Sequence, residues 1–320
     1  MMISKHAFST YTFLASLWVA LTLLPACRPE MRADSESSAQ IQTTSDSAPT
    51  YSATSAETIR FVAFGDMGTG GHIQYEVARA VERKCRQSGC DFAVTLGDNI
   101  YNNGVSSPED PQFQEKFEQP YAALDFPFYM VPGNHDYRGN VEAQVAYTQR
   151  STRWKMPARY YHFQAGPVTF IALDTNVPDQ TQQHYLKQQL TAAQTPWKIA
   201  FGHHPRYTNS FYYNTQSAPL KTLLDSLCGQ AQLYLSGHEH DKQHLKSRCG
   251  VSYLVVGTGG GVRPSNPGPD TLFSKASPGF AWFEVTPRRL YFEILDQQGK
   301  VEYRSSLLRS PAAEPPSPSL

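Results

Sequence analysis

Short apolar segments alternate with amphipathic segments along the middle of the chain. Ile59–Phe64 is continuously apolar, which is typical of a strand buried on both faces. His72–Gln87 repeats apolar residues at helical spacing, which predicts a helix with one buried face. The same criteria predict strands at Asp91–Leu96, Phe126–Val131, Trp197–Phe201 and Gln232–Leu235, and helices at Asn140–Arg150, Gln182–Gln194 and Pro219–Leu227.

The second half of the pattern predicts antiparallel strands. Tyr160–Gln164 and Val168–Leu173 flank a Gly-Pro turn and predict a hairpin. Further strands are predicted, the last three without intervening helices, at Val251–Val256, Phe280–Val285, Arg289–Leu295 and Lys300–Arg304. We therefore expect a mixed α/β fold (α+β mixed), a four-layer αββα sandwich of two mixed β-sheets flanked by helices.

The first residues have the pattern of an export signal. Lys5 precedes an apolar run, Phe13–Leu24, that is short for a membrane span and typical of a signal-peptide core. Leu24-Pro25-Ala26-Cys27 resembles a bacterial lipobox, which predicts cleavage after residue 26 and lipid on Cys27. An ordinary secretory signal cut nearby is the alternative. We expect an exported protein, either a periplasmic or outer-membrane-anchored bacterial lipoprotein or a secreted one.

Composition divides the rest of the chain into three parts. Residues 27–57 are rich in Ser, Thr and Ala without apolar periodicity, which predicts a flexible tether. Residues 310–320 form a Pro/Ser-rich tail. Residues 58–309 remain as one foldable domain of ordinary large size.

The overall charge limits the partners. Among 320 residues, 28 basic residues balance 28 acidic ones, whereas nucleic-acid binding by phosphate neutralisation needs a cationic excess. Apolar residues make up 40% of the chain, which suffices for a substantial core. We expect a monomer that binds no nucleic acid and meets a membrane only through lipid on Cys27.

Four cysteines remain after Cys27, namely Cys85, Cys90, Cys228 and Cys249. An even number fits an oxidising compartment and allows three pairings. A Cys85–Cys90 bond would close a small loop, and a Cys228–Cys249 bond would tie a helix end to a later strand. A zinc site is the weaker alternative, because the first spacing is wide and no histidine lies nearby.

Five of the predicted strands run into short polar motifs, each with a glycine at its start. Ligand sites in open α/β sheets collect at the carboxyl ends of strands, so we expect these motifs to converge. Each motif alone is weakly specific, and their joint occurrence is the strong signal. The motifs are Gly65-Asp66-Met67-Gly68, Gly97-Asp98-Asn99-Ile100-Tyr101, Gly133-Asn134-His135-Asp136, Gly202-His203-His204-Pro205 and Gly237-His238-Glu239-His240-Asp241.

The donor types in these motifs indicate metal ions. Two carboxylates, one amide oxygen, three imidazoles and one phenol exceed what one tetrahedral zinc needs, and they suit two ions that share a bridging carboxylate. A phenolate favours a trivalent ion, with iron(III) the obvious one. The charges of iron(III), a divalent ion, three anionic ligands and a bridging hydroxide sum to about +1, which suits a phosphate anion.

Together these motifs resemble those of the purple acid phosphatases within the calcineurin-like metallophosphoesterases, and most of all those of the small tartrate-resistant type. The family pattern GDxG, GDxxY, GNH(D/E), a single His and GHxH is complete. Similarity extends over Arg60–Arg304 and includes Phe113–Glu118 and Arg153-Trp154.

The resemblance implies a role for each matched residue. Asp66, Tyr101 and His240 would hold iron(III), and Asp98 would bridge. Asn134, His203 and His238 would hold the second ion, which would be iron, zinc or manganese. His135 would be the histidine that faces the substrate. Asp136 and Asp241 would orient the ligands.

The implied activity is acid phosphatase, a metal-dependent phosphoric monoester hydrolase that uses metal-bound hydroxide. A phosphodiesterase or nucleotidase of the same fold is one alternative, and a non-catalytic lipid-anchored binding protein is another. The chain departs from the family where a second substrate histidine is often found, because Tyr212 and Tyr213 stand there. His204 is also unusual, and we expect it on the surface.

Overall fold

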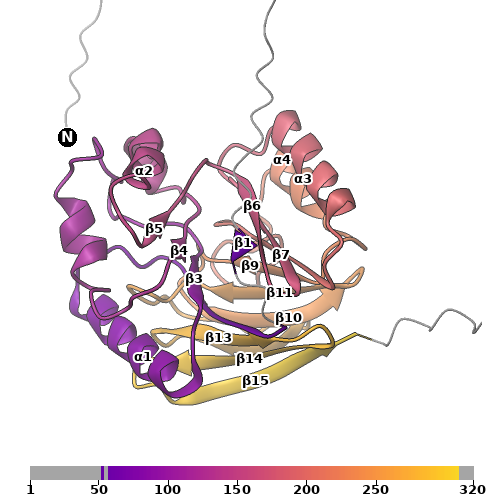
Figure 1. Cartoon of the computed structure of the whole chain (residues 1–320). Coiled ribbons are helices and arrows are strands. Elements are labelled where there is room, and N and C mark those ends of the chain that lie inside the picture. Colours follow the sequence, from indigo (N-terminus) through magenta and orange to yellow (C-terminus); the bar gives the residue numbers. More distant parts are fainter. Residues whose placement is uncertain (1–51, 54–56, 310–320) are drawn as a thin grey trace, which may run out of the picture. The chain divides into compact units, whose positions relative to one another are not determined.

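The computed structural model describes residues 52–53 and 57–309, which form two β-sheets with helices on their outer faces (Figure 1). One sheet has seven strands in the order β15-β14-β13-β2-β3-β4-β5, and the other has eight in the order β1-β6-β7-β8-β9-β11-β10-β12. Among the described residues, no helix combines the length and apolar character needed to cross a membrane.

The seven-stranded sheet contains β2 (Ile59–Phe64), β3 (Phe92–Thr95), β4 (Phe128–Tyr129), β5 (Trp154–Lys155), β13 (Gly279–Val285), β14 (Arg289–Asp296) and β15 (Val301–Leu308). The eight-stranded sheet contains β1 (Ser52–Ala53), β6 (Tyr161–Ala165), β7 (Val168–Ala172), β8 (Trp197–Phe201), β9 (Leu233–Ser236), β10 (Lys242–Arg248), β11 (Val251–Val256) and β12 (Thr271–Lys275). Both sheets are mixed, because parallel pairs such as β2–β3 and β8–β9 continue into antiparallel pairs such as β13–β14 and β10–β11.

Three of the four α-helices that the structure describes begin at a capping side chain. The four helices are α1 (His72–Ser88), α2 (Val141–Tyr147), α3 (Gln180–Ala192) and α4 (Ala218–Asp225). The side chains of Asn140, Asp179 and Ser217 accept hydrogen bonds from the first turns of α2, α3 and α4, which satisfies otherwise unpaired N–H groups. A π-helical turn at Gln114–Glu118 and a 3₁₀ turn at Asp136–Arg138 complete the helical segments.

Aromatic side chains fill the space between the two sheets. The Phe61 ring on β2 meets the Phe170 ring on β7 edge to face, with centroids 5.2 Å apart. Tyr129 on β4 stacks on Phe163 on β6 at 3.8 Å. These rings belong to one fully buried cluster to which both sheets contribute, and apolar burial of this kind is the main force that holds sheets together.

A second cluster lies on the outer face of the eight-stranded sheet. Leu186 and Leu190 of α3 and Leu220 and Leu224 of α4 pack there with Tyr234 of β9. Helix α1 contacts β13 of the other sheet and buries Val77, Ala80 and Val81. The expected sandwich of two mixed sheets with outer helices is therefore confirmed.

The sequence missed the strands that polar residues form. β10 reads Lys-Gln-His-Leu-Lys-Ser-Arg, yet its first four residues are buried. The buried polar side chains are tolerated because each has a hydrogen-bonding partner, for example Lys242 with Glu302 at 2.6 Å and His244 with Ser252 at 3.0 Å. β12 was also missed, and two residues expected in the tether, Ser52 and Ala53, pair in parallel with β6 as β1.

Both cysteine pairs named in the sequence analysis are disulfides. Cys85 in the last turn of α1 is bonded to Cys90 just beyond the helix, and Cys228 is bonded to Cys249. The zinc alternative for these cysteines is therefore wrong. The predicted signal segment, Cys27 and the tail lie outside the described residues.

Candidate metal centre

All seven predicted metal ligands converge at the carboxyl ends of the central parallel strands. The four oxygen donors follow β2, β3 and β4 of the seven-stranded sheet, and the three imidazoles follow β8 and β9 of the eight-stranded sheet. The site therefore lies where the same ends of the two sheets meet. The oxygen donors are Asp66, Asp98, Tyr101 and Asn134, and the imidazoles are His203, His238 and His240.

Three of the donors form one group. The Tyr101 hydroxyl lies 3.0 Å from Oδ1 of Asp66 and 3.1 Å from Nε2 of His240. Nε2 of His240 lies 3.2 Å from the same Asp66 oxygen. A carboxylate, a phenol and an imidazole thus point at one small space, as the resemblance to the purple acid phosphatases implied.

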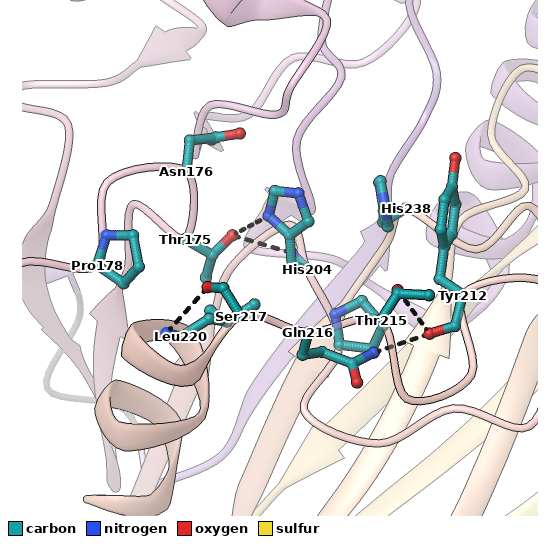
Figure 2. Close-up of a pocket in the computed structure, with 11 residues that line it drawn as sticks. Thr175, Asn176, Pro178, His204, Tyr212, Thr215, Gln216, Ser217, Leu220 and His238 are labelled. Atoms are coloured by element: carbon teal, nitrogen blue, oxygen red, sulfur yellow. Dashed lines mark hydrogen bonds between the residues drawn. The ribbon is translucent and has the colours of Figure 1, made fainter.

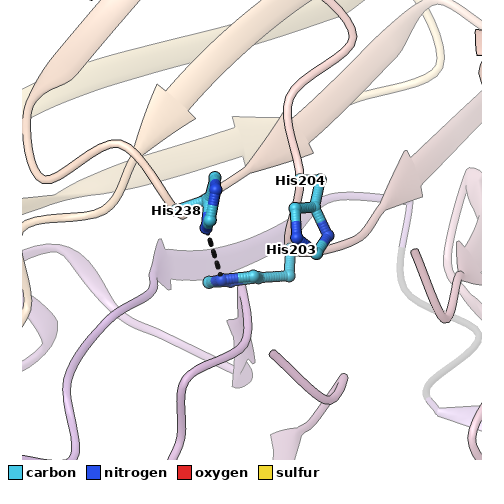
Figure 3. Close-up of side chains that lie close together, drawn as sticks. All are labelled: His203, His204 and His238. Carbon is cyan, nitrogen blue, oxygen red and sulfur yellow. Dashed lines mark hydrogen bonds between the residues drawn. The ribbon is translucent and has the colours of Figure 1, made fainter. Parts of the chain in front are cut away.

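Three other donors form a second group. Nε2 of His203 lies 3.1 Å from Oδ1 of Asn134 and 3.1 Å from Nδ1 of His238 (Figure 3). Nδ1 of His203 lies 2.8 Å from the Leu96 carbonyl oxygen, which only accepts, so Nδ1 carries the hydrogen. When His203 is in its neutral form, Nε2 therefore presents a lone pair to the same space as Asn134.

Asp98 contacts both groups. Its Oδ1 lies 3.5 Å from Nε2 of His203, and the nearby Tyr101 hydroxyl helps to lower the pKa of Asp98. Burial opposes ionisation, but His203, His135 and the His135 backbone N–H hold the pKa of Asp98 below its ordinary value. Asp98 is therefore an ionised carboxylate between two donor groups, which is the arrangement that a bridging ligand requires.

The charges of the site call for cations. Burial and the carboxylates of Asp66 and Asp98 raise the pKa of Tyr101 far above its ordinary value. Without a metal ion the phenol is thus firmly neutral, and only a strongly positive ion beside its oxygen would favour the phenolate. The donor set, with hard anionic oxygens on one side and imidazoles on the other, fits two ions.

Backbone strain accompanies the ligands. Asp66, Asp98 and His238 have positive φ angles of 56°, 51° and 68°, a region that side chains other than glycine seldom occupy. Gly97 has φ of +81°, and a Cβ there would lie 2.6 Å from Nδ1 of His203. Glycine at position 97 therefore lets the Asp98 loop approach the His203 ring.

Asp136 joins two of the ligand loops. Its fully buried carboxylate accepts hydrogen bonds from the backbone N–H groups of Gly133, Asn99 and Ile100 at 2.8, 3.0 and 3.1 Å. These groups flank Asn134, Asp98 and Tyr101 in the chain. Asp136 thus fixes the backbone of two loops and touches no predicted metal ligand with its side chain.

Asp241 is held by polar side chains of the neighbouring loops. Its carboxylate accepts hydrogen bonds from Ser210, from Ser265 at 2.7 Å and from Gln243 at 2.8 Å, and not from a ligand histidine among the described residues. Its neighbour Glu239 accepts from Thr208 at 2.9 Å and from the Tyr212 backbone at 2.7 Å. The two carboxylates hold the loops over the site, and the sequence analysis assigned no role to Glu239.

His135 faces the site without joining either donor group. Its Nδ1 lies 2.6 Å from the Asn102 carbonyl oxygen, and its Nε2 lies 3.9 Å from Oδ2 of Asp98. The ring rests beside Tyr101 with centroids 4.4 Å apart. One ring nitrogen is therefore directed toward the metal site.

His204 is partly buried beside the site, so the expectation of a surface histidine is wrong. Its ring lies 4.5 Å from that of His238, and Tyr212 stacks on His238 at 4.0 Å (Figures 2 and 3). Thr175 holds the His204 ring through a 2.8 Å contact to Nδ1. Burial and His203 lower the pKa of His204 to about 3, so this ring is neutral. Tyr213 is 62% exposed and points elsewhere.

Two pockets flank the donor groups. One, of about 430 Å³, contains His238, His204 and Tyr212 and continues over Leu220 of α4 (Figure 2). The other, of about 470 Å³, contains Tyr101, His135 and His240. The loops around the site thus leave room on both sides for groups larger than a phosphate.

The calcineurin-like phosphoesterase family profile matches residues 59–242. Tartrate-resistant acid phosphatase type 5 of Mus musculus is 32% identical over 82% of this chain and 94% of its own length, and the Homo sapiens enzyme is 32% identical over 78% and 91%. Purple acid phosphatase 7 of Arabidopsis thaliana is 31% identical over 79% and 87%.

Solved structures share the fold. The purple acid phosphatase PPD1 from yellow lupin seeds aligns with a TM-score of 0.67 and 17% identity, over 82% of this chain and 55% of that chain. GAP50, described as the anchor in the inner membrane complex of Plasmodium, aligns with a TM-score of 0.69 and 23% identity, over 79% and 89%. At these identities the two structures support the fold alone.

Proposed function

Because the chain belongs to the calcineurin-like phosphoesterase family and its relatives are acid phosphatases, we propose that it hydrolyses phosphate monoesters at a dinuclear site of iron(III) and a divalent ion. The observation that carries this proposal is the convergence of seven donors in two groups that share Asp98. Asp66, Tyr101 and His240 would hold iron(III), and the second ion, which would be iron, zinc or manganese, would be held by Asn134, His203 and His238.

When bound, the two ions supply an activated water and neutralise the charge of the phosphate group. The protein supplies the rest. His135 points one ring nitrogen toward the site and is placed to give a proton to the leaving oxygen. Asp136 keeps the loops of Asp98 and Asn134 in register, so that the donors are in place before the substrate arrives.

The activity is tested by phosphate release from phenyl phosphate, with bis(p-nitrophenyl) phosphate as the diester and metal analysis of the same sample. We expect hydrolysis of the monoester and two metal ions per chain. Asp98→Ala should lose both the activity and the bound metal. A preference for the diester would favour a phosphodiesterase. A fully metal-loaded protein that cleaves neither ester would favour a binding protein of this fold.

The identity of the first ion is tested by colour. A phenolate bound to iron(III) absorbs visible light, so the oxidised protein should be pink to purple. Tyr101→Phe should remove the band and retain the fold, because the phenol oxygen makes only site contacts. An active, iron-loaded wild type without a visible band would contradict the role of Tyr101.

We also propose that the protein is exported and anchored through lipid on Cys27. The two disulfides support export, since such bonds persist in oxidising compartments. Wild type should partition into detergent, and Cys27→Ser should not. An unlipidated wild-type protein that begins at another residue would contradict the anchor.

A further inference from the structure

The 470 Å³ pocket beside Tyr101 contains cations that the proposed chemistry does not use. It lies between the segment that follows Tyr101 and the Gly260–Arg263 segment, and it opens on His135 and His240. The residues that line it are Thr69, Tyr101, Asn102, Lys116, His135, His240, Gly260, Gly261 and Arg263.

None of these lining residues is acidic, whereas Lys116 and Arg263 are cationic. Neither cation has a carboxylate within ion-pair distance among the residues that the structure describes. A third cation, Arg138, reaches the rim, where its guanidinium lies 3.5 Å from the Asn102 carbonyl oxygen. The lining of the pocket therefore carries cations and no carboxylate.

Each cation is held in place with donors to spare. The Lys116 ammonium donates to the Tyr101 carbonyl and to Gln112 at 2.7 Å, which leaves one of its three N–H groups. The Arg263 backbone N–H donates to the His240 carbonyl at 2.8 Å and so fixes the residue beside the site. Within the described chain, its guanidinium makes one long hydrogen bond, at 3.5 Å to the His238 carbonyl.

The pocket on the other side of the site has the opposite character. Its lining, which includes Thr175, Tyr212, Gln216, Ser217 and Leu220, carries no charged side chain (Figure 2). A neutral or aromatic group suits that side, whereas the cationic side chains that line either of these two pockets, Lys116 and Arg263, both belong to the pocket beside Tyr101. The site thus distinguishes its two sides by charge.

We propose that Lys116 and Arg263 form an anion subsite that selects phosphate monoesters carrying a second anionic group, a carboxylate or a phosphate, close to the phosphate that is cleaved. The subsite rests on the proposed phosphatase function and adds a substrate class to it. Arginine and lysine bind both anions through charge-assisted hydrogen bonds, and the guanidinium fork can hold two oxygens at once.

The test compares substrates that differ by the second anion. Glycerol 3-phosphate and 3-phosphoglycerate differ by a carboxylate, and ethylene glycol monophosphate and ethylene glycol bisphosphate differ by a phosphate. Arg263→Gln should raise KM for the two substrates with a second anion, 3-phosphoglycerate and ethylene glycol bisphosphate, about tenfold more than KM for their partners, since one hydrogen bond between charged groups is lost. Lys116→Gln should act in the same direction, and Lys300→Gln, an exposed charge on the β14–β15 turn, should change neither ratio.

Binding without turnover provides a second measurement. Phosphonoacetate should bind metal-loaded wild type more tightly than ethylphosphonate, and Arg263→Gln should abolish that difference while the metal content stays at the wild-type level. An effect on the carboxylate pair alone or the phosphate pair alone identifies which anion the subsite takes. An equal rise in KM for both members of each pair would assign Arg263 to the cleaved phosphate and overturn the subsite. Unchanged ratios would overturn it too, whereas a wild type inert on glycerol 3-phosphate and phenyl phosphate would refute the phosphatase function itself.

Discussion

The Nδ1 atom of His135 lies 2.6 Å from the carbonyl oxygen of Asn102, so this nitrogen carries a hydrogen and Nε2 is the atom left to face the site. Nε2 lies 3.9 Å from Asp98 and makes no contact with Asn134 or His203 among the described residues. When both ring nitrogens carry hydrogens, His135 can therefore give a proton from Nε2, whereas its neighbour Asn134 has the geometry of a ligand.

The two neighbours should therefore respond differently to truncation. We expect His135→Ala to keep both metal ions and to lose about 10²–10⁴-fold in turnover, most on an alkyl phosphate whose leaving group needs a proton. Asn134→Ala should lose metal and turnover together. Metal content and rates on an alkyl and a nitrophenyl phosphate check this. Loss of a metal from His135→Ala, or equal slowing of both esters, would mean that the proton comes from another group.

Gly97→Ala should weaken the metal site through sterics alone. The added Cβ would lie 2.6 Å from the His203 ring, and the φ of +81° would be strained as well. Gly229→Ala is the matched control, because φ there is +68° but no atom lies within 4 Å. We expect both variants to lose about 1 kcal/mol of stability and only Gly97→Ala to lose metal. Equal metal content in the two variants would show that the close approach is unimportant.

Tyr212 and Tyr213 should differ although they are adjacent. The Tyr212 ring stacks on His238 and lines a pocket, whereas Tyr213 is 62% exposed. Stacking of a substrate ring on Tyr212 would be worth about 0.5–1.5 kcal/mol. We therefore expect Tyr212→Ala to raise KM for phenyl phosphate by about 2- to 12-fold. Tyr213→Ala should stay within twofold of wild type. The reverse order of effects would place the aromatic contact with substrate on Tyr213.

Glu302 should matter for stability far from the site. Burial alone would raise the pKa of Glu302, but hydrogen bonds from Lys242, Lys275 and Ser277 hold it below the ordinary 4.5. Lys242 is fully buried, so Glu302→Gln leaves a buried cation without its counter-charge, at a cost of about 3 kcal/mol. Chemical denaturation measures this cost.

The carboxylate with the lowered pKa stabilises the fold fully above pH 4.5 and loses that contribution as the pH falls through its folded-state pKa. The difference in the free energy of unfolding between wild type and Glu302→Gln should therefore become smaller at acidic pH. Glu284→Gln is the control, because Glu284 pairs with exposed arginines and should cost under about 1 kcal/mol. A difference that does not change with pH would show that Glu302 does not stabilise the fold through its ion pair with Lys242.

The sequence was sufficient to predict the two-sheet sandwich and the metal-ligand candidates because both depend on local patterns. Asp66 and Asp98 each follow an apolar strand and a glycine, and strand ends converge in any parallel sheet. Lys116, Arg263 and Glu239 were missed because their roles depend on contacts between distant loops. β10 was missed for the same reason, since Lys242 is buried only because Glu302 lies opposite.

The division of the donors between the sheets has a consequence for folding. The oxygen donors follow strands of one sheet and the imidazoles follow strands of the other, so neither sheet alone offers a complete set. Bound ions would clamp the two sheets together at one end. Ions present at a hundred times their Kd would add about 2.7 kcal/mol to the free energy of unfolding. We therefore expect a chelator to lower the melting temperature as well as the turnover, and metal uptake to report that the two sheets have docked.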